Sequence, residues 1–306
     1  MSHYDAIRHR ISGGELVILD GGIGTEVLRR DMTWADHQVL SRPDAVRGLH
    51  EDYIRAGADV ISTNSFQLAR RSFLNHFRDE AHARYIGAPD IGTRAAEMLA
   101  ASVRLAMEAR DAVERPVAIA GAVTTLEWCF RPDLAPNTDE MRAEYREIME
   151  VMREAGADLI LLETVNSVTE AKIGLEAARQ AGLPCWVGLV CNEEGRLFTG
   201  ETMADAQREL GPLGPGAILV NCIPPDDATA GLRELLAVRD APCGLYPHIG
   251  RFDPPEWHFT DEYPPPRLLE EARRWREMGA TVIGGCCGTT PEHIAALSNG
   301  LRAASA

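Results

Sequence analysis

Short apolar runs recur along the chain, and amphipathic stretches separate them. Eight runs are almost continuously apolar, at 15–20, 59–64, 117–122, 158–163, 185–191, 217–222, 243–248 and 281–286. Runs of this kind indicate parallel strands, because such strands are covered on both faces. The stretches between them, such as 141–155, 169–181 and 266–278, show the spacing of amphipathic helices. The pattern therefore predicts alternating strands and helices.

A weak internal repeat supports one repeated strand–helix unit. Residues 56–61, 155–160 and 278–283 each place a glycine where a helix would end before an entering strand. Eight such units predict an α/β protein with a single (β/α)₈ TIM barrel, with 1–306 as one domain. A doubly wound open sheet is the alternative, but no GxGxxG motif follows the first strand. The proline-rich segment 247–266 is predicted to be a long loop over the active face.

Composition and charge exclude several kinds of partner. The 306 residues include 31 Lys and Arg against 46 Asp and Glu, for a net charge of −15. Without a basic cluster, nucleic acids and anionic membranes are not expected partners. We find no apolar stretch of membrane-spanning length and no signal peptide, and the seven scattered cysteines do not form a secreted disulfide framework. These features predict a cytoplasmic enzyme that acts on small molecules.

The predicted strand ends carry the candidate chemistry. In a barrel of this type, active-site groups lie at the C-terminal ends of the strands. Here those ends carry carboxylates, an amide, thiols and an imidazole: Asp20, Asn64, Glu163, Cys191, Cys222, His248, Cys286 and Cys287. His293, which opens the last helix, is expected at the surface.

Three of the cysteines form a candidate metal site. Cys222 ends the sixth strand, while Cys286 and Cys287 end the eighth, which is its next-but-one neighbour in a barrel. Glycines on both sides of the pair allow both sulfurs to face one ion. Three thiolates suit Zn²⁺ and leave a fourth position open, as in catalytic zinc sites.

Other interpretations of the cysteines remain open at this point. Cys191 also ends a strand, and a fourth thiolate there would close the site and make the zinc structural. Coincidental placement of Cys222, Cys286 and Cys287 is a further alternative, because a buried cysteine usually behaves as a small hydrophobic residue. That simpler role is the one expected for Cys129, Cys185 and Cys243.

Five motifs, in order along the chain, resemble the homocysteine S-methyltransferase family. They are 19–25 (LDGGIGT), 63–67 (TNSFQ), 162–164 (LET), 220–222 (VNC) and 284–291 (GGCCGTTP), the last being the most specific. The resemblance implies a zinc-dependent (β/α)₈ barrel that methylates the sulfur of homocysteine to give methionine. Two departures concern the substrate pocket: the third-strand motif reads AGAVT, and His248 stands where many members have Asn.

The resemblance also implies roles for individual residues. Zn²⁺ would be held by Cys222, Cys286 and Cys287, and would activate the substrate thiol without any further catalytic residue. Homocysteine would be bound by the group Asp20, Gly21, Gly22, Asn64 and Glu163, with the two carboxylates on its α-amino group. Trp34, in the first strand–helix loop, would face a cationic methyl donor through cation–π attraction.

The methyl donor is the least determined feature. Betaine-using members place an aromatic residue directly after the Glu of the fourth strand, where this chain has Thr164. Sulfonium-using members usually carry Arg at the position of Gly288. On balance we expect a sulfonium such as S-methylmethionine.

Alternatives to this function stay open. The chain could use betaine, or serve as the homocysteine-binding subunit of a split corrinoid-dependent methionine synthase. A different class of function is a non-catalytic barrel that senses redox state through zinc or thiols. Homo-oligomers, a corrinoid-protein partner and acceptors other than homocysteine, such as selenohomocysteine, are likewise undecided.

Overall fold

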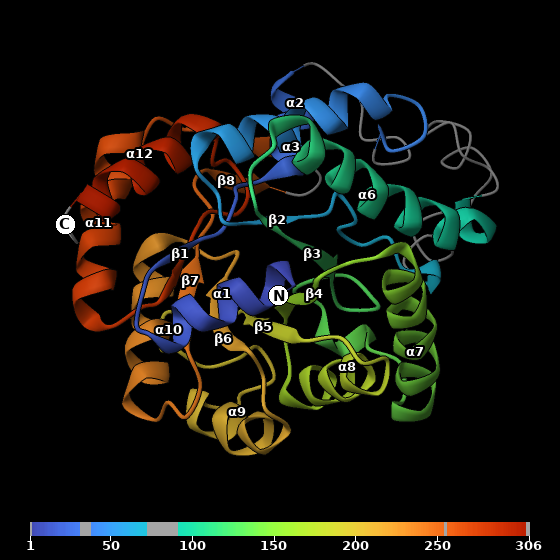
Figure 1. Cartoon of the computed structure of the whole chain (residues 1–306). Helices are drawn as coiled ribbons and strands as arrows, with labels where there is room; N and C mark the ends of the chain where they lie inside the picture. Colours follow the sequence, from blue (N-terminus) through green and yellow to red (C-terminus); the bar gives the residue numbers. More distant parts are fainter. Residues whose placement is uncertain (1, 31–37, 72–90, 254–255, 304–306) are drawn as a thin grey trace.

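Eight parallel strands form a closed barrel (Figure 1). The computed structural model describes residues 2–30, 38–71, 91–253 and 256–303. The barrel strands are β1 (Val17–Ile18), β2 (Val60–Ser62), β3 (Ala118–Val123), β4 (Leu159–Val165), β5 (Cys185–Leu189), β6 (Ala217–Asn221), β7 (Cys243–Tyr246) and β10 (Val282–Ile283). The barrel closes where Leu19 pairs with Val60 and the Asp20 N–H donates to the Val60 carbonyl at 3.1 Å. The predicted TIM barrel is confirmed, and every predicted strand is present; most are shorter than predicted, whereas β3 and β4 extend beyond the predicted ends at 122 and 163.

The helices surround the barrel (Figure 1). They are α1 (His3–Ser12), α2 (Ile23–Arg29), α3 (Pro43–Ala56), α6 (Ile91–Val113), α7 (Thr138–Ala155), α8 (Val168–Gln180), α9 (Met203–Leu210), α10 (Pro225–Ala237), α11 (Pro265–Met278) and α12 (Pro291–Arg302). Gly57, Gly156 and Gly279 end α3, α7 and α11 in left-handed conformations, at φ of 106°, 94° and 115°. The repeated glycines therefore mark helix ends, as predicted.

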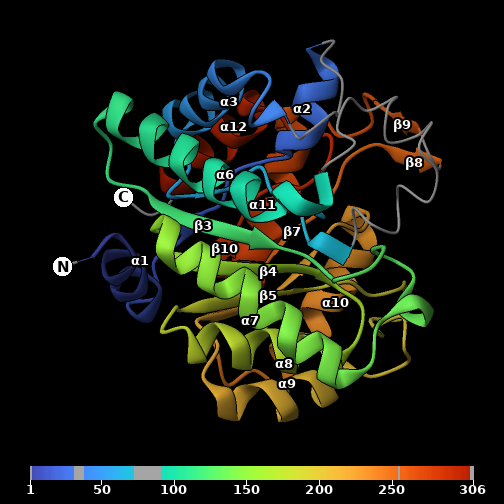
Figure 2. The same cartoon turned by 90° about the vertical axis from the view of Figure 1, so that its right-hand side faces the viewer.

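The barrel interior is filled by alternate residues of the strands. Within β4, Leu159 and Leu161 face inward, whereas Ile160 and Leu162 pack against the surrounding helices. At one end of the barrel, α1 covers this interior core with Tyr4, Ile7 and Ile11 (Figure 2). The strand C-termini point toward the opposite end, which stays available for chemistry (Figure 2).

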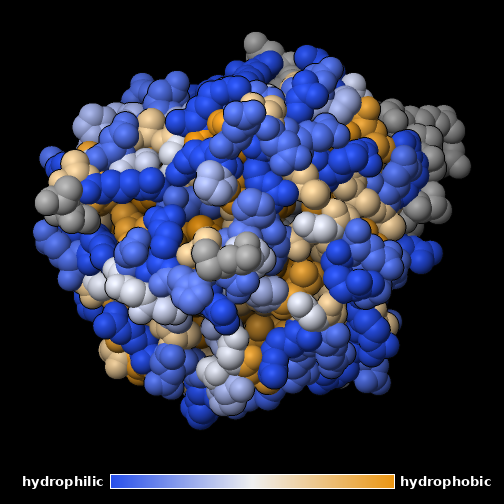
Figure 3. Space-filling view, viewed as in Figure 1, coloured by the Kyte–Doolittle hydropathy of each residue, from blue (hydrophilic) through white to orange (hydrophobic). Residues whose placement is uncertain are grey.

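The face of the molecule shown in Figure 3 is mostly hydrophilic, with small separated hydrophobic areas. The charged fraction of the chain, 25%, is the usual one for a globular protein. Within the described part of the chain, no helix combines the length and apolar character needed to cross a membrane.

The segment after β7 is more ordered than a plain loop. It contains an antiparallel hairpin of β8 (Arg251–Asp253) and β9 (Glu256–His258), at the barrel end opposite α1 (Figure 2). The prediction of a long loop over 247–266 did not include this hairpin. The Trp257 ring meets the His248 ring edge-on, with centroids 5.5 Å apart, so the hairpin covers part of the active end.

Candidate functional site

The thiols of Cys222, Cys286 and Cys287 lie together at the C-terminal end of the barrel. Their sulfurs are all within 4.8 Å of one another. Hydrogen bonds from the Cys222 and Cys286 thiols hold the pKa of Cys287 well below its usual range. Sulfurs that share a tetrahedral Zn²⁺ at 2.3 Å are about 3.8 Å apart. The three thiols therefore fit a soft metal ion with little rearrangement.

Backbone departures from strand geometry bring the three sulfurs together. Cys222 follows the inward-facing Asn221, so strand alternation alone would turn it outward. Its left-handed φ of 53° changes that direction. Beyond β10, the Cys286 N–H donates to the Pro247 carbonyl at 2.8 Å and the Cys287 carbonyl accepts from Ile249 at 2.8 Å. The two-cysteine segment is thus a loop held against the end of β7.

Cys191 does not join the cluster. Its sulfur lies 3.9 Å from the Asp227 carbonyl and under Gly231, both on α10, so it faces the helices. Burial raises the pKa of this thiol to about 12. A site closed by this fourth thiolate is therefore not formed. The remaining thiols are buried, as expected: Cys129, Cys185 and Cys243.

Asp20 is buried at the end of β1 and is held by Ser62 on β2. The Ser62 N–H donates to Asp20 Oδ2 at 2.7 Å, and the Ser62 hydroxyl contacts both carboxylate oxygens at 3.0 Å. Burial raises the pKa of Asp20 to about 8, although the Ser62 hydrogen bonds oppose this shift. Ser62 was not among the predicted site residues, and nothing in the run 59–64 distinguishes it from the other polar residues there, Asp59, Thr63 and Asn64.

Glu163 is buried at the end of β4, near both the thiols and Asp20. Burial raises its pKa to about 8, and the charges of Cys287 and Asp20 add to this effect. The Tyr246 hydroxyl lies 3.5 Å from Glu163 Oε2. Among the described residues, no Lys or Arg forms an ion pair with Asp20 or Glu163. Asp20 and Glu163 are thus two buried carboxylates that interact with each other, and neither pairs with a described Lys or Arg.

The structure also describes three of the other four predicted binding residues: Gly21, Gly22 and Asn64. A side chain on Gly22 would lie 2.7 Å from the Cys286 carbonyl, and one on Gly21 would lie 2.9 Å from the Tyr53 hydroxyl. Gly22 therefore allows the first strand–helix loop to pack against the two-cysteine loop, and Gly21 allows the same loop to pack against α3. Asn64 is buried just beyond β2. Trp34 lies outside the described residues.

The two histidines singled out from the sequence lie in different places. His248 is close to the thiols: burial lowers the pKa of its ring, while the Cys287 charge and the Cys222 backbone oppose the shift. His293 is buried, contrary to expectation. Its Nε2 lies 2.9 Å from the Tyr263 carbonyl and its Nδ1 lies 2.9 Å from the Thr290 hydroxyl, so it caps the start of α12.

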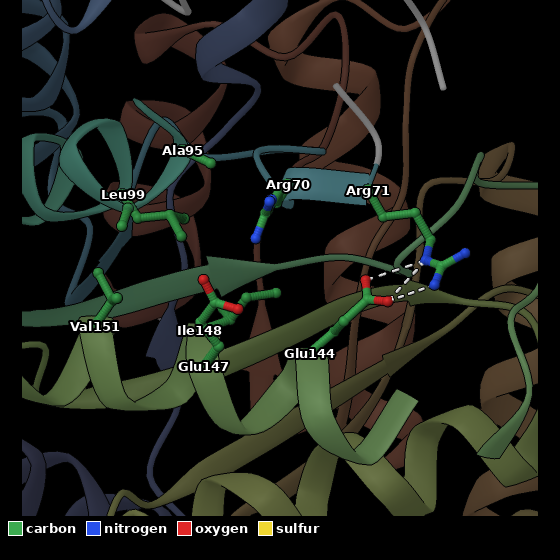
Figure 4. Close-up of a pocket in the computed structure, with 9 residues that line it drawn as sticks. Arg70, Arg71, Ala95, Leu99, Glu144, Glu147, Ile148 and Val151 are labelled. Carbon is green, nitrogen blue, oxygen red and sulfur yellow. Dashed lines mark hydrogen bonds and ion pairs between the residues drawn. The ribbon is translucent and has the colours of Figure 1, made fainter. Parts of the chain in front are cut away.

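A cavity of about 350 Å³ lies away from this chemistry, on the outer side of the barrel between α6 and α7 (Figure 4). Arg71 crosses its rim and pairs with Glu144, with Nε to Oε1 at 2.9 Å. The wall also includes aliphatic side chains such as Leu99 and Val151. Because this cavity contains no nucleophile and lies apart from the thiols, it is not the candidate site.

Comparison with known proteins agrees with the geometry. The family model described as homocysteine S-methyltransferase matches residues 17–301. The homocysteine S-methyltransferase YbgG of Bacillus subtilis is 28% identical, covering 94% of this chain and 95% of that protein. The homocysteine S-methyltransferase of Escherichia coli is 29% identical, covering 97% and 99%.

A solved structure shows the same fold. The metallated form of the homocysteine methyltransferase MmuM from Escherichia coli superimposes with a TM-score of 0.77 at 26% identity, covering 96% of this chain and 99% of that one. The resemblance carried by the five motifs is therefore confirmed over nearly the whole chain. The chain is a methyltransferase and belongs to the homocysteine S-methyltransferase family.

Proposed function

We propose that this protein transfers a methyl group from a cationic donor to the thiol of homocysteine, giving methionine, at a Zn²⁺ ion held by Cys222, Cys286 and Cys287. The observation that carries the proposal is the pairing of three clustered thiols with two buried carboxylates, Asp20 and Glu163, that have no cationic partner among the described residues. An amino acid thiol complements both halves, because it offers a sulfur at one end and an ammonium at the other.

The three thiols favour zinc as the metal. Zn²⁺ prefers soft sulfur ligands in tetrahedral geometry, and three protein ligands leave the fourth position for substrate. When bound, the ion deprotonates a coordinated thiol and holds it as a nucleophile. Three cysteine thiolates would outweigh the positive charge of Zn²⁺, so a substrate sulfur bound there would keep electron density for attack on a methyl group.

The carboxylates are proposed to hold the amino-acid end of homocysteine. A buried carboxylate without a cationic partner is costly, and burial raises the pKa values of Asp20 and Glu163 to about 8. An ammonium group beside them would favour their charged forms. Gly21, Gly22 and Asn64 are proposed to complete the pocket.

A sulfonium such as S-methylmethionine is the proposed donor. Its methyl carbon is already activated by the positive sulfur, so attack by a thiolate needs no base at carbon. Thr164, at the end of β4, supplies no aromatic wall for the trimethylammonium of betaine. Trp34 is proposed to face the donor.

A donor assay tests this function. Zinc-replete protein is incubated with L-homocysteine and, in separate reactions, S-methylmethionine, betaine or a methylated corrinoid protein, and methionine is measured. The proposal expects methionine from the sulfonium. Methionine formed from betaine but not from S-methylmethionine would show that betaine is the donor. Methionine formed only with the corrinoid protein would make the chain one subunit of a split synthase. No methionine from any donor, despite bound zinc, would favour a thiol-sensing role.

Residues 1–306 are proposed to act as one homocysteine-binding domain. The interior core is continuous from Tyr4 on α1 to Val282 on β10, which supports a single unit. Sedimentation of the zinc-loaded protein would determine whether this unit forms homo-oligomers.

A further inference from the structure

Asn221 makes two hydrogen bonds across the interior of the barrel. Its Oδ1 accepts from the Thr164 N–H at 3.1 Å, and its Nδ2 donates to the Thr164 Oγ1 at 3.0 Å. Both side chains are completely buried. These bonds join β6 to β4, which are not neighbours, since β5 lies between them. Asn221 therefore spans a strand to reach a single residue.

Gly188 on β5 makes this span possible. A Cβ at this position would lie 2.9 Å from Asn221 Oδ1 and 2.5 Å from the Tyr246 hydroxyl. Tyr246, on β7, points over the same glycine toward Glu163, at 3.5 Å. The missing side chain thus opens a gap through which two residues from the far strands reach the end of β4.

The residues linked by Asn221 are both in unusual backbone conformations. Thr164 directly follows Glu163 and has a φ of 59°, which is rare for a β-branched residue. The register of β4 against β5 also shifts between Leu162 and Val165. Cys222 directly follows Asn221 and has a φ of 53°. Such conformations persist only where the surrounding structure holds them. The side chain of Asn221 holds Thr164 through two hydrogen bonds, and the backbone of Asn221 leads directly into Cys222.

We propose that Asn221 is a positioning residue that sets the distance between the Cys222 thiolate and the Glu163 carboxylate, and thereby selects the length of the amino acid thiol. The inference rests on the proposed function, in which the substrate sulfur binds at the thiols and its ammonium at Glu163. Cysteine is shorter than homocysteine by one carbon–carbon bond, about 1.5 Å. A rigid span between the two anchors therefore matches only one of the two thiols.

Binding measurements on the metal-loaded protein test this inference without a methyl donor. Co²⁺ is loaded in place of zinc, and sulfur-to-cobalt charge-transfer absorption is followed during titration with L-homocysteine or L-cysteine. The variants are Asn221→Ala, which removes both hydrogen bonds, and Thr164→Val, which removes only the side-chain one. Thr229→Val is the matched control. It also removes a partly buried threonine hydrogen bond, in which Thr229 Oγ1 accepts from Trp275 Nε1 at 2.8 Å, but this bond joins two outer helices, α10 and α11. Metal content is measured for each protein.

We expect every variant to keep one metal ion per chain. Homocysteine affinity should fall about tenfold in Asn221→Ala and about threefold in Thr164→Val, with cysteine affinity changing much less, so that the preference for homocysteine collapses. Thr229→Val should keep the wild-type preference.

Several results would overturn the inference. An unchanged preference, an equal loss of affinity for both thiols, or loss of the metal in Asn221→Ala and Thr164→Val would each make Asn221 a structural residue only. If Asn221→Ala does not fold, Thr164→Val decides between these outcomes. Failure of the loaded wild-type protein to bind homocysteine would instead overturn the proposed function itself.

Discussion

Burial and position along a strand do not distinguish the clustered thiol of Cys222 from that of Cys191. Cys222 and Cys191 both follow barrel strands and both are buried. Only Cys222 turns toward the pair of cysteines after β10. The two cysteines therefore differ in the direction of their side chains, and substituting each one tests whether only Cys222 binds the metal.

Cys222→Ser should lower the zinc content of the purified protein well below one ion per chain, because a soft thiolate ligand is lost. Cys191→Ser is the matched control and should keep zinc, since its thiol faces α10. Elemental analysis after dialysis measures both. Full zinc and full turnover in Cys222→Ser would contradict the assigned ligand set.

Glu163→Gln should raise the KM for homocysteine about tenfold, equivalent to roughly 1.4 kcal/mol, because the ammonium loses a charged partner. The zinc content should not change. Steady-state kinetics with varied homocysteine and saturating donor provide the test. Loss of zinc with an unaltered KM would show that Glu163 serves the metal rather than the substrate.

At the scale of single elements, strand alternation explains which parts of the site could be predicted. Residues 185, 187 and 189 of β5 face the helices, and Cys191 has the same parity, so alternation agrees with its place outside the cluster. The same rule would also exclude Cys222, so alternation alone could not separate the two thiols. The direction of Cys222 could not be predicted, because it depends on a left-handed residue that alternation cannot reveal. The strand-crossing bonds of Asn221 were equally hidden, since they require Gly188 and two strands distant in sequence.

The glycines show the opposite case. Gly57, Gly156 and Gly279 could be predicted as helix ends because a left-handed C-cap is a local preference for glycine. The hairpin of β8 and β9 was missed because short antiparallel pairs within a proline-rich segment leave little alternation to detect. His293 was misplaced because its capping partners lie in Thr290 and in the distant Tyr263.

Helix α3 contains a buried histidine that should make folding sensitive to acid. Burial lowers the pKa of His50 to about 4, from 6.5 in the unfolded chain, and neither ring nitrogen has a hydrogen-bond partner among the residues that the structure describes. Between pH 6.5 and 4 the unfolded state takes up a proton that the folded state does not. Stability therefore falls as the pH falls through this window, by about 3 kcal/mol in total from this residue.

Replacing the ring should remove this contribution. In urea unfolding at pH 7, 6 and 5, His50→Met should lose less stability on acidification than the wild-type protein does. The comparison cancels the buried carboxylates, which are common to both proteins. Identical pH dependence in the two proteins would show that His50 is not the group responsible.

At the scale of the whole molecule, the helix that covers the interior core and the candidate site lie at opposite ends of the barrel. Helix α1 covers one end through Tyr4, Ile7 and Ile11, while the thiols and carboxylates occupy the other (Figure 2). Changes to the covered end should therefore alter folding without altering the site.

Ile7→Ala should lower the free energy of unfolding by about 2–5 kcal/mol, because a cavity is left in the interior core. Leu134→Ala is the control, since this side chain is exposed, and its effect should stay within about 0.5 kcal/mol. Urea unfolding gives both values. Zinc content and the KM for homocysteine should match the wild-type values in both variants, and a changed KM in Ile7→Ala would contradict the separation of the two ends.

The central claim is that three protein thiolates hold a zinc ion whose fourth position receives the substrate sulfur. X-ray absorption at the zinc edge, on the purified protein with and without L-homocysteine, measures this directly. The account predicts three sulfur neighbours near 2.3 Å, from Cys222, Cys286 and Cys287, and four after homocysteine is added. Four sulfurs before the substrate is added, or no additional sulfur after it, would contradict the account.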